Sequence, residues 1–229
     1  MIKENIRKVQ ERIQAACQRC QRDASEVTLI AVSKTKPLSM IEEAYSAGMR
    51  EFGENKPQEL RDKSRQLETP VHWHMIGSLQ TNKIKYVVGT ACLIHSVDSL
   101  SLAEAIEKES DKRNCITEIL LEVNVAEEES KHGFSCTELP EAVEHISKYP
   151  HLHINGLMTV APYTENAEEN RTYFRKMKEL VVDIRSKNID NVSMDILSMG
   201  MSSDYEVAIE EGATMVRIGT GIFGERIYS

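Results

Sequence analysis

Short apolar runs alternate with amphipathic segments along most of the chain. The runs are rich in Val, Ile and Leu, which is typical of buried parallel strands, and the segments between them repeat apolar residues at helical spacing. We expect strands over Val27–Ser33, Arg50–Phe52, Val71–Ile76, Leu93–Ser96, Ile116–Asn124, His153–Val160, Met194–Ser198 and Thr214–Ile218. We expect helices over residues 2–22, Leu38–Ala47, Gln58–Gln66, Leu100–Lys112, Leu139–Lys148, Glu168–Lys187 and Asp204–Glu211, with another starting near Thr81.

Strict alternation of strands and helices predicts a parallel sheet, and eight such units with right-handed crossovers close into a TIM barrel. No stretch of the sequence reads as a linker between domains. We therefore predict a single-domain α/β protein, residues 1–229, with a (β/α)8 barrel and an extra N-terminal helix over residues 2–22. We expect this helix to cover one end of the core, and we expect no helix after the last strand.

Charge and cysteine content restrict the classes of binding partner and the cellular compartment that we expect. The chain has 28 basic and 36 acidic residues, a formal net charge of −8, and its basic residues are scattered. Such a surface predicts neither a nucleic-acid nor a membrane partner, and favours a small molecule. No apolar run approaches a membrane span or a signal peptide, and five cysteines without a framework pattern fit a reducing compartment. We expect a cytoplasmic monomer.

Lys34 is the first residue with candidate chemistry. It follows the apolar run Val27–Ser33 directly, so its amine is expected at the carboxyl end of a strand, where TIM barrels place their functional groups. Partial burial there disfavours the ammonium form and makes the free amine easier to reach. Lys36 shares this direction but lies past the strand end, next to Pro37.

Two loops rich in glycine and hydroxyl groups follow the last two strands, residues 198–203 and 217–221. These are the loops that commonly hold phosphate in a TIM barrel, and closure of the barrel would bring them beside Lys34. An amine next to a phosphate site suggests a ligand with both an aldehyde and a phosphate, such as pyridoxal 5′-phosphate (PLP). Arg217 is then placed to face the ring nitrogen and, because it stays protonated, to weaken the ring as an electron sink.

Six motifs occur in order: AVSKTKP at 31–37, FGEN at 52–55, HMIGSLQTNK at 74–83, GLM at 156–158, LSMGMS at 197–202 and RIGTGIFG at 217–224. They resemble those of the pyridoxal phosphate homeostasis protein family, which is similar to the barrel domain of alanine racemase. The resemblance implies that Lys34 forms a Schiff base with PLP and that Arg217 faces the pyridine nitrogen. It implies further site residues: Ser198, Ser202, Gly219 and Thr220 for the phosphate, and Asn55 and Met199 for the ring. Lys131 matches a family lysine after the fifth strand.

The same resemblance bears on whether the protein is a cofactor carrier or an enzyme. Racemases of this fold type use a second base, a tyrosine from a further β-rich domain of the partner subunit, and the chain ends at Ser229, shortly after the eighth strand. We therefore expect a protein without catalytic residues that holds PLP reversibly in vitamin B6 homeostasis, with PLP-dependent apo-enzymes as recipients. A racemase of low activity is the alternative.

Histidines raise a third possibility, a metal-dependent barrel hydrolase. His72 and His74 share one face of a strand, and His151 and His153 repeat this spacing. His72 and His74 lie early or in the middle of their strand and His151 precedes its strand, away from the carboxyl ends where a catalytic metal would be bound. We therefore expect structural histidines and no metal.

Overall fold

The computed structural model describes residues 1–128 and 132–224, so Lys131 lies outside the described residues. Its centre is a closed barrel in which eight parallel strands pair in sequence order and β8 pairs with β1. The predicted TIM barrel is confirmed. The strands are β1 Thr28–Val32, β2 Glu51–Glu54, β3 His72–Met75, β4 Leu93–Val97, β5 Thr117–Glu122, β6 Leu152–Met158, β7 Val192–Ser198 and β8 Met215–Ile218.

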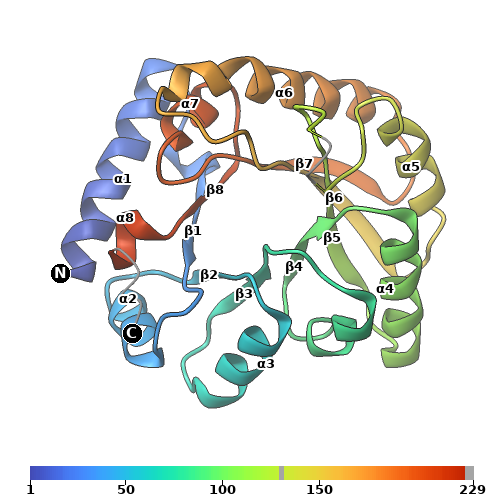
Figure 1. The fold of residues 1–229 in the computed structure, drawn as a ribbon, viewed down its shortest axis with the longest axis horizontal. Coiled ribbons are helices and arrows are strands. Elements are labelled where there is room, and N and C mark those ends of the chain that lie inside the picture. Colours follow the sequence, from blue (N-terminus) through green and yellow to red (C-terminus); the bar gives the residue numbers. More distant parts are fainter. Residues whose placement is uncertain (129–131, 225–229) are drawn as a thin grey trace.

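Helices surround the barrel in a ring (Figure 1). They are α1 Ile2–Arg19, α2 Leu38–Ser46, α3 Pro57–Gln66, α4 Leu100–Arg113, α5 Leu139–Ile146, α6 Arg171–Ser186, α7 Tyr205–Glu210 and α8 Thr220–Phe223, with 3-10 turns η1 Ala24–Glu26, η2 Thr81–Tyr86 and η3 Ala167–Asn170. None of the helices in the described part of the chain has the length and apolar character that a membrane span requires.

The N-terminal helix α1 was expected to cover one end of the core, and this is wrong. It lies in the outer ring, where it packs against α7, α8 and α2 (Figure 1). A short helix, α8, also follows β8, contrary to the prediction. Because α8 has only four residues, it cannot cover the last strand, and the apolar face of α1, built on Ile6, Val9 and Ile13, takes this place.

The segment after β3 also differs from the prediction. Instead of an α-helix, Thr81–Tyr86 forms the 3-10 turn η2. Gly89 follows this turn closely with a φ of 75°, a left-handed conformation that interrupts a helix, so the segment between β3 and Gly89 is too short to form a stable α-helix.

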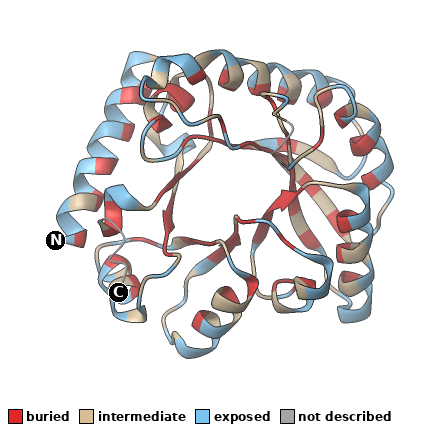
Figure 2. Cartoon of the chain, viewed as in Figure 1, coloured by how far each residue is buried: buried red, intermediate tan, exposed pale blue. Residues whose placement is uncertain are grey.

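The core has two layers. One large apolar cluster lies between the strands and the helices, and a small one inside the barrel consists of Leu93, Leu120 and Met158. Figure 2 shows buried residues on the strands and on the inner helix faces, with exposed residues outside. Above the small interior cluster the barrel is filled by polar side chains, and these form the floor of the site described below.

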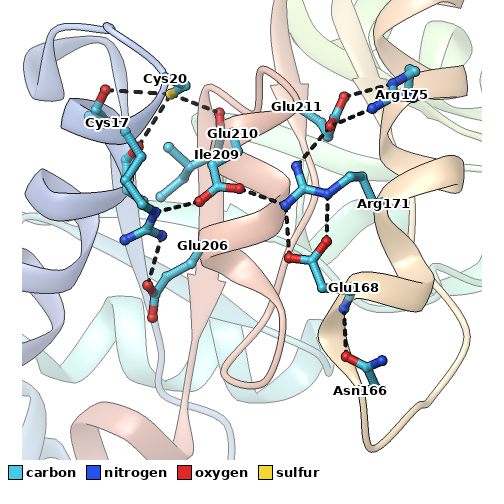
Figure 3. A network of polar contacts seen from close by, with 12 residues as sticks. Cys17, Cys20, Asn166, Glu168, Arg171, Arg175, Glu206, Ile209, Glu210 and Glu211 are labelled. Carbon is cyan, nitrogen blue, oxygen red and sulfur yellow. Dashed lines mark hydrogen bonds and ion pairs between the residues drawn. The ribbon is translucent and has the colours of Figure 1, made fainter.

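Ion pairs join the helices around the point where the barrel closes (Figure 3). Arg171 of α6 pairs with Glu210 of α7 at 2.6 Å, with Glu211 at 2.9 Å and with Glu168 at 2.7 Å. Glu210 also pairs with Arg19 of α1 at 2.6 Å. The network therefore connects α1 to α6 through α7.

We expect Arg171→Met to lower the free energy of unfolding by about 1 kcal/mol, because it removes one ion-pair partner from each of three carboxylates, of which Glu210 and Glu211 keep a second arginine. Urea unfolding at low and high salt is the measurement, and the difference should shrink at about 1 M salt. Arg7→Met is the matched control, since the ion pairs of Arg7 with described residues lie within α1 and their loss should cost less. Equal losses for both variants would contradict a role for the network.

Candidate functional site

A cavity of about 530 Å³ opens at the carboxyl end of the barrel. This volume lies in the range of small-molecule sites. Six of the residues expected from the sequence line it: Lys34, Asn55, Ser202, Arg217, Gly219 and Thr220. Its wall also includes Val32, Lys36, Ile76, Val160, Tyr163, Met201, Ser203 and Gly224. Residues at or just after the ends of β1, β2, β3, β6, β7 and β8 thus meet around one space.

A tight turn presents Lys34 to the cavity. The turn follows β1 and is closed by the Lys36 N–H, which donates to the Ser33 carbonyl at 3.0 Å. Thr35 has a φ of 62°, a conformation that non-glycine residues rarely adopt. Its N–H donates to Glu59 at 2.6 Å, which holds the strained residue in place. Lys36 shares the cavity, and its Nζ donates to the carbonyls of Phe223 and Gly224 at 3.3 Å.

A buried ion pair supports this turn from below. Lys63 Nζ donates to the Ser33 carbonyl at 2.7 Å and to Glu54 at 2.8 Å, and Ser33 Oγ donates to the same Glu54 oxygen at 2.6 Å. Burial raises the pKa of Glu54, although the Lys63 ammonium opposes the shift. These contacts fix the backbone that carries Lys34.

Asn55 extends from the end of β2 into the cavity. Among the described residues, its buried Oδ1 has no hydrogen-bond partner, which is costly unless a ligand donates to it. Gly77 makes this position possible, since a Cβ there would lie 2.4 Å from the Asn55 carbonyl oxygen. The end of β3 therefore packs directly against the backbone of Asn55.

The two loops expected to hold phosphate meet at the cavity. Thr220 Oγ1 donates to Ser202 Oγ at 3.3 Å, although the residues are 18 positions apart. Thr220 begins α8, whose Ile222 and Phe223 N–H groups donate to the Gly219 carbonyl, so the N–H groups of Thr220 and Gly221 are the ones without an acceptor within the helix. Gly200 allows the loop after β7 to lie close to α7: its φ is 90°, and a Cβ would lie 2.6 Å from that of Ala208. Hydroxyl and N–H donors thus converge on one wall.

Arg217 forms part of the cavity floor and is only 4% exposed. Its NH1 donates to Ser198 Oγ at 2.6 Å and its NH2 to the Thr159 carbonyl at 2.8 Å. Burial lowers the pKa of Arg217 to about 10, while Glu122 and Asp204 oppose the shift. The guanidinium therefore remains charged at neutral pH, with its direction fixed by two hydrogen bonds.

A chain of polar contacts continues from Ser198 through the barrel. His95 Nδ1 lies 2.9 Å from Ser198 Oγ, His95 Nε2 lies 2.9 Å from His74 Nδ1, and His74 Nε2 lies 2.7 Å from Glu51. Burial lowers the pKa of His95 well below its ordinary value, so its ring is neutral. One arrangement satisfies every contact: Arg217 donates to Ser198, Ser198 to His95, His95 to His74 and His74 to Glu51.

Two predicted site residues do not reach the cavity. Ser198 and Met199 are fully buried and are absent from its wall. Ser198 ends β7 with its Oγ turned into the barrel, where it contacts Arg217 and His95. The Met199 N–H donates to the Met215 carbonyl, and its side chain packs in the outer apolar cluster. Ser198 thus contacts Arg217 below the cavity, and its contact with phosphate stays a prediction.

Sequence reasoning missed Glu122 and His95. Burial raises the pKa of Glu122 to about 7, with Asp98 adding to the shift and Arg217 and His132 opposing it. Glu122 is the last residue of β5, much as Lys34 lies at the end of the apolar run of β1. A charged residue at the end of an apolar run was therefore the sequence signal that could have identified Glu122. His95 stands inside such a run, where a polar residue indicates a contact within the barrel.

The histidines proposed for a metal hydrolase lie away from this cavity. His72 begins β3 and His153 is the second residue of β6, so both are at the amino end of the barrel. His151 bonds Glu107 at 2.9 Å and His153 bonds Glu118 at 2.8 Å. None of these three lines the cavity that contains Lys34.

Known proteins match nearly the whole chain. The sequence model described as "Alanine racemase, N-terminal domain" matches residues 2–227. The pyridoxal phosphate homeostasis protein of Aquifex aeolicus is 47% identical over 226 residues, 98% of each chain. That of Escherichia coli is 40% identical over 233 residues, 100% of this chain and 98% of its own.

Solved structures agree with these matches. PipY of Synechococcus elongatus, a structure with PLP bound, has a TM-score of 0.83 and 34% identity, and the match covers 98% of this chain and 100% of that chain. Alanine racemase of Clostridium difficile has a TM-score of 0.76 at 12% identity over 99% of this chain and 58% of its own, a likeness of fold alone. The chain belongs to the family of pyridoxal phosphate homeostasis proteins, built on the barrel fold of the alanine racemase N-terminal domain.

Proposed function

We propose that the protein binds PLP reversibly through Lys34 and takes part in its intracellular homeostasis as a carrier. The observation that carries the proposal is the meeting of Lys34, the Ser202 and Thr220 hydroxyls and the Arg217 guanidinium around one cavity. Relatives across the full length have the name pyridoxal phosphate homeostasis protein, and one related structure contains PLP.

The cavity residues fit this cofactor. When bound, PLP supplies an aldehyde that bonds reversibly to a primary amine, together with an anionic phosphate. Lys34 would provide the amine, and Ser202, Gly219 and Thr220 would hold the phosphate. Arg217 would donate to the ring nitrogen, because its side chain is charged and oriented. The buried Asn55 Oδ1, which has no partner among the described residues, would accept from a ring substituent.

The rim of the cavity favours a carrier over a racemase. Tyr163 is 89% exposed and Val160 is 37% exposed, and both line the cavity. A racemase must exclude water from a reactive carbon between two bases. The hydroxyl of Tyr163 is open to solvent, so it provides no such protection. An open rim instead suits release of the cofactor to PLP-dependent apo-enzymes. We propose that the protein does this in the cytoplasm, as a monomer with a single domain over residues 1–229.

Borohydride reduction of the PLP-loaded protein tests the assignment. We expect one cofactor mass per chain, located by peptide mass spectrometry on Lys34, and no labelling of Lys34→Ala. Lys36→Ala is the matched control, since Lys36 shares the cavity, and it should label as the wild-type protein does. A label on Lys36, or none on wild-type protein, would refute the proposal.

Chiral analysis of alanine tests the carrier against the racemase. Wild-type protein loaded with PLP is expected to racemise alanine no faster than free PLP at the same concentration. Tyr163→Phe should behave identically, because the exposed hydroxyl has no catalytic part in a carrier. Turnover that is well above free PLP and is lost in Tyr163→Phe would identify a racemase instead.

A further inference from the structure

A second group of chemically distinctive side chains lies at the amino end of the barrel, opposite the cavity that contains Lys34. Glu51 of β2, His74 of β3 and Cys92, just before β4, each offer one ligand atom, and the three atoms lie within 4.8 Å of one another. They line a separate cavity of about 290 Å³. His74 Nε2 is 2.7 Å from Glu51 Oε2 and 3.6 Å from Cys92 Sγ.

The surrounding contacts orient two of the three side chains. His74 is 2% exposed, and its other ring nitrogen lies 2.9 Å from His95 Nε2. The second carboxylate oxygen of Glu51 is 2.6 Å from His72 Nδ1. Partners on the remote atoms of histidine and carboxylate ligands are typical of metal sites, where they fix the direction of the ligand. Cys92 is accessible, so an ion has a path to the group.

We propose that Glu51, His74 and Cys92 bind a zinc-class divalent transition metal ion, with water in the fourth position. Thiolate, imidazole and carboxylate together suit zinc and disfavour magnesium and calcium. Tetrahedral zinc with ordinary bond lengths places its nitrogen and sulfur ligands about 3.6 Å apart, which matches the His74 to Cys92 distance. The distance between His74 Nε2 and Glu51 Oε2 must increase by about 0.6 Å when the ion replaces the hydrogen that they share.

Metal binding releases one proton, and no atom changes its oxidation state. Three bonds form from the ion, to Sγ, Nε2 and Oε2, while the thiol proton of Cys92 leaves to solvent. The hydrogen on His74 moves from Nε2 to Nδ1 and that on His95 moves from Nε2 to Nδ1, so that His74 then donates to His95 and His95 to Ser198 Oγ. The ion carries no catalytic role in this proposal, and the site is separate from the PLP cavity.

Metal binding is tested on chelator-treated, full-length protein with Zn²⁺ and Co²⁺ as probes. We expect one equivalent of Zn²⁺ in competition with a chromophoric chelator, and a thiolate-to-cobalt absorption band with Co²⁺. Cys92→Ser should lose the band and at least about 100-fold in affinity, more than the loss of a supporting residue costs. His72→Ala removes only the support of Glu51 and should weaken binding about 10-fold.

Cys115→Ser is the matched control, because Cys115 is a second partly accessible free thiol away from this group. It should keep both the stoichiometry and the cobalt band. PLP loading of Cys92→Ser should equal that of wild-type protein, which separates this test from that of the cofactor site. Absence of stoichiometric binding to wild-type protein, or binding that survives Cys92→Ser, would overturn the proposal.

Discussion

Arg217→Met is expected to weaken PLP binding at least about tenfold, the loss that corresponds to one charge-assisted hydrogen bond of about 1.4 kcal/mol. The same substitution should lower the free energy of unfolding of the cofactor-free protein by about 2 kcal/mol. Methionine fills a similar volume but cannot donate, so the buried Thr159 carbonyl loses its Arg217 partner. Equilibrium titration with PLP and urea unfolding without it measure the two effects separately.

Arg185→Met is the matched control, since Arg185 is half exposed and pairs with Asp195 on the outside of the barrel. It should leave PLP affinity unchanged. Arg217→Lys adds a sharper comparison, because a single ammonium retains charge but cannot span Ser198 Oγ and the Thr159 carbonyl together. If Arg217→Lys bound PLP as tightly as wild-type protein, the orientation of the guanidinium would have no role in binding.

The sequence predicts the barrel well because each buried strand must be an apolar run between polar connections. All eight strands lie within a few residues of their expected bounds, and Lys34 follows β1 as expected. Barrel closure, inferred from the strand count, is what brings Arg217 and Thr220 to the same cavity as Lys34. Local pattern and topology thus locate the site.

Details that depend on register or on distant contacts could not be predicted. Ser198 reads as a loop hydroxyl, yet it is the last residue of β7, and its side chain points inward to Arg217. The place of α1 in the ring depends on the brevity of α8, which no pattern within α1 reveals. Glu122 was overlooked because a single glutamate at a strand end has no signal of burial until its neighbours are known.

Glu122 is expected to make the protein less stable as pH rises from about 4.5 to about 7. Its pKa is raised from 4.5 to about 7, by burial first and by Asp98 second. In this window the unfolded chain has released the proton that the folded protein still holds, so the free energy of unfolding falls with pH. The full effect, complete above about pH 7.5, is about 3 kcal/mol.

Glu122→Gln isolates this contribution, because glutamine occupies the same volume without a titrating proton. Urea unfolding of both proteins at a series of pH values is the measurement, with Glu141→Gln on the exposed face of α5 as the control. Relative to wild-type protein, Glu122→Gln should gain about 3 kcal/mol between pH 4.5 and pH 8, whereas Glu141→Gln should show no such rise. Because Arg217 holds the pKa of Glu122 down, the same profile measured in Arg217→Met should shift to higher pH. A pH-independent difference for Glu122→Gln would mean that this carboxylate is hydrated in the folded protein.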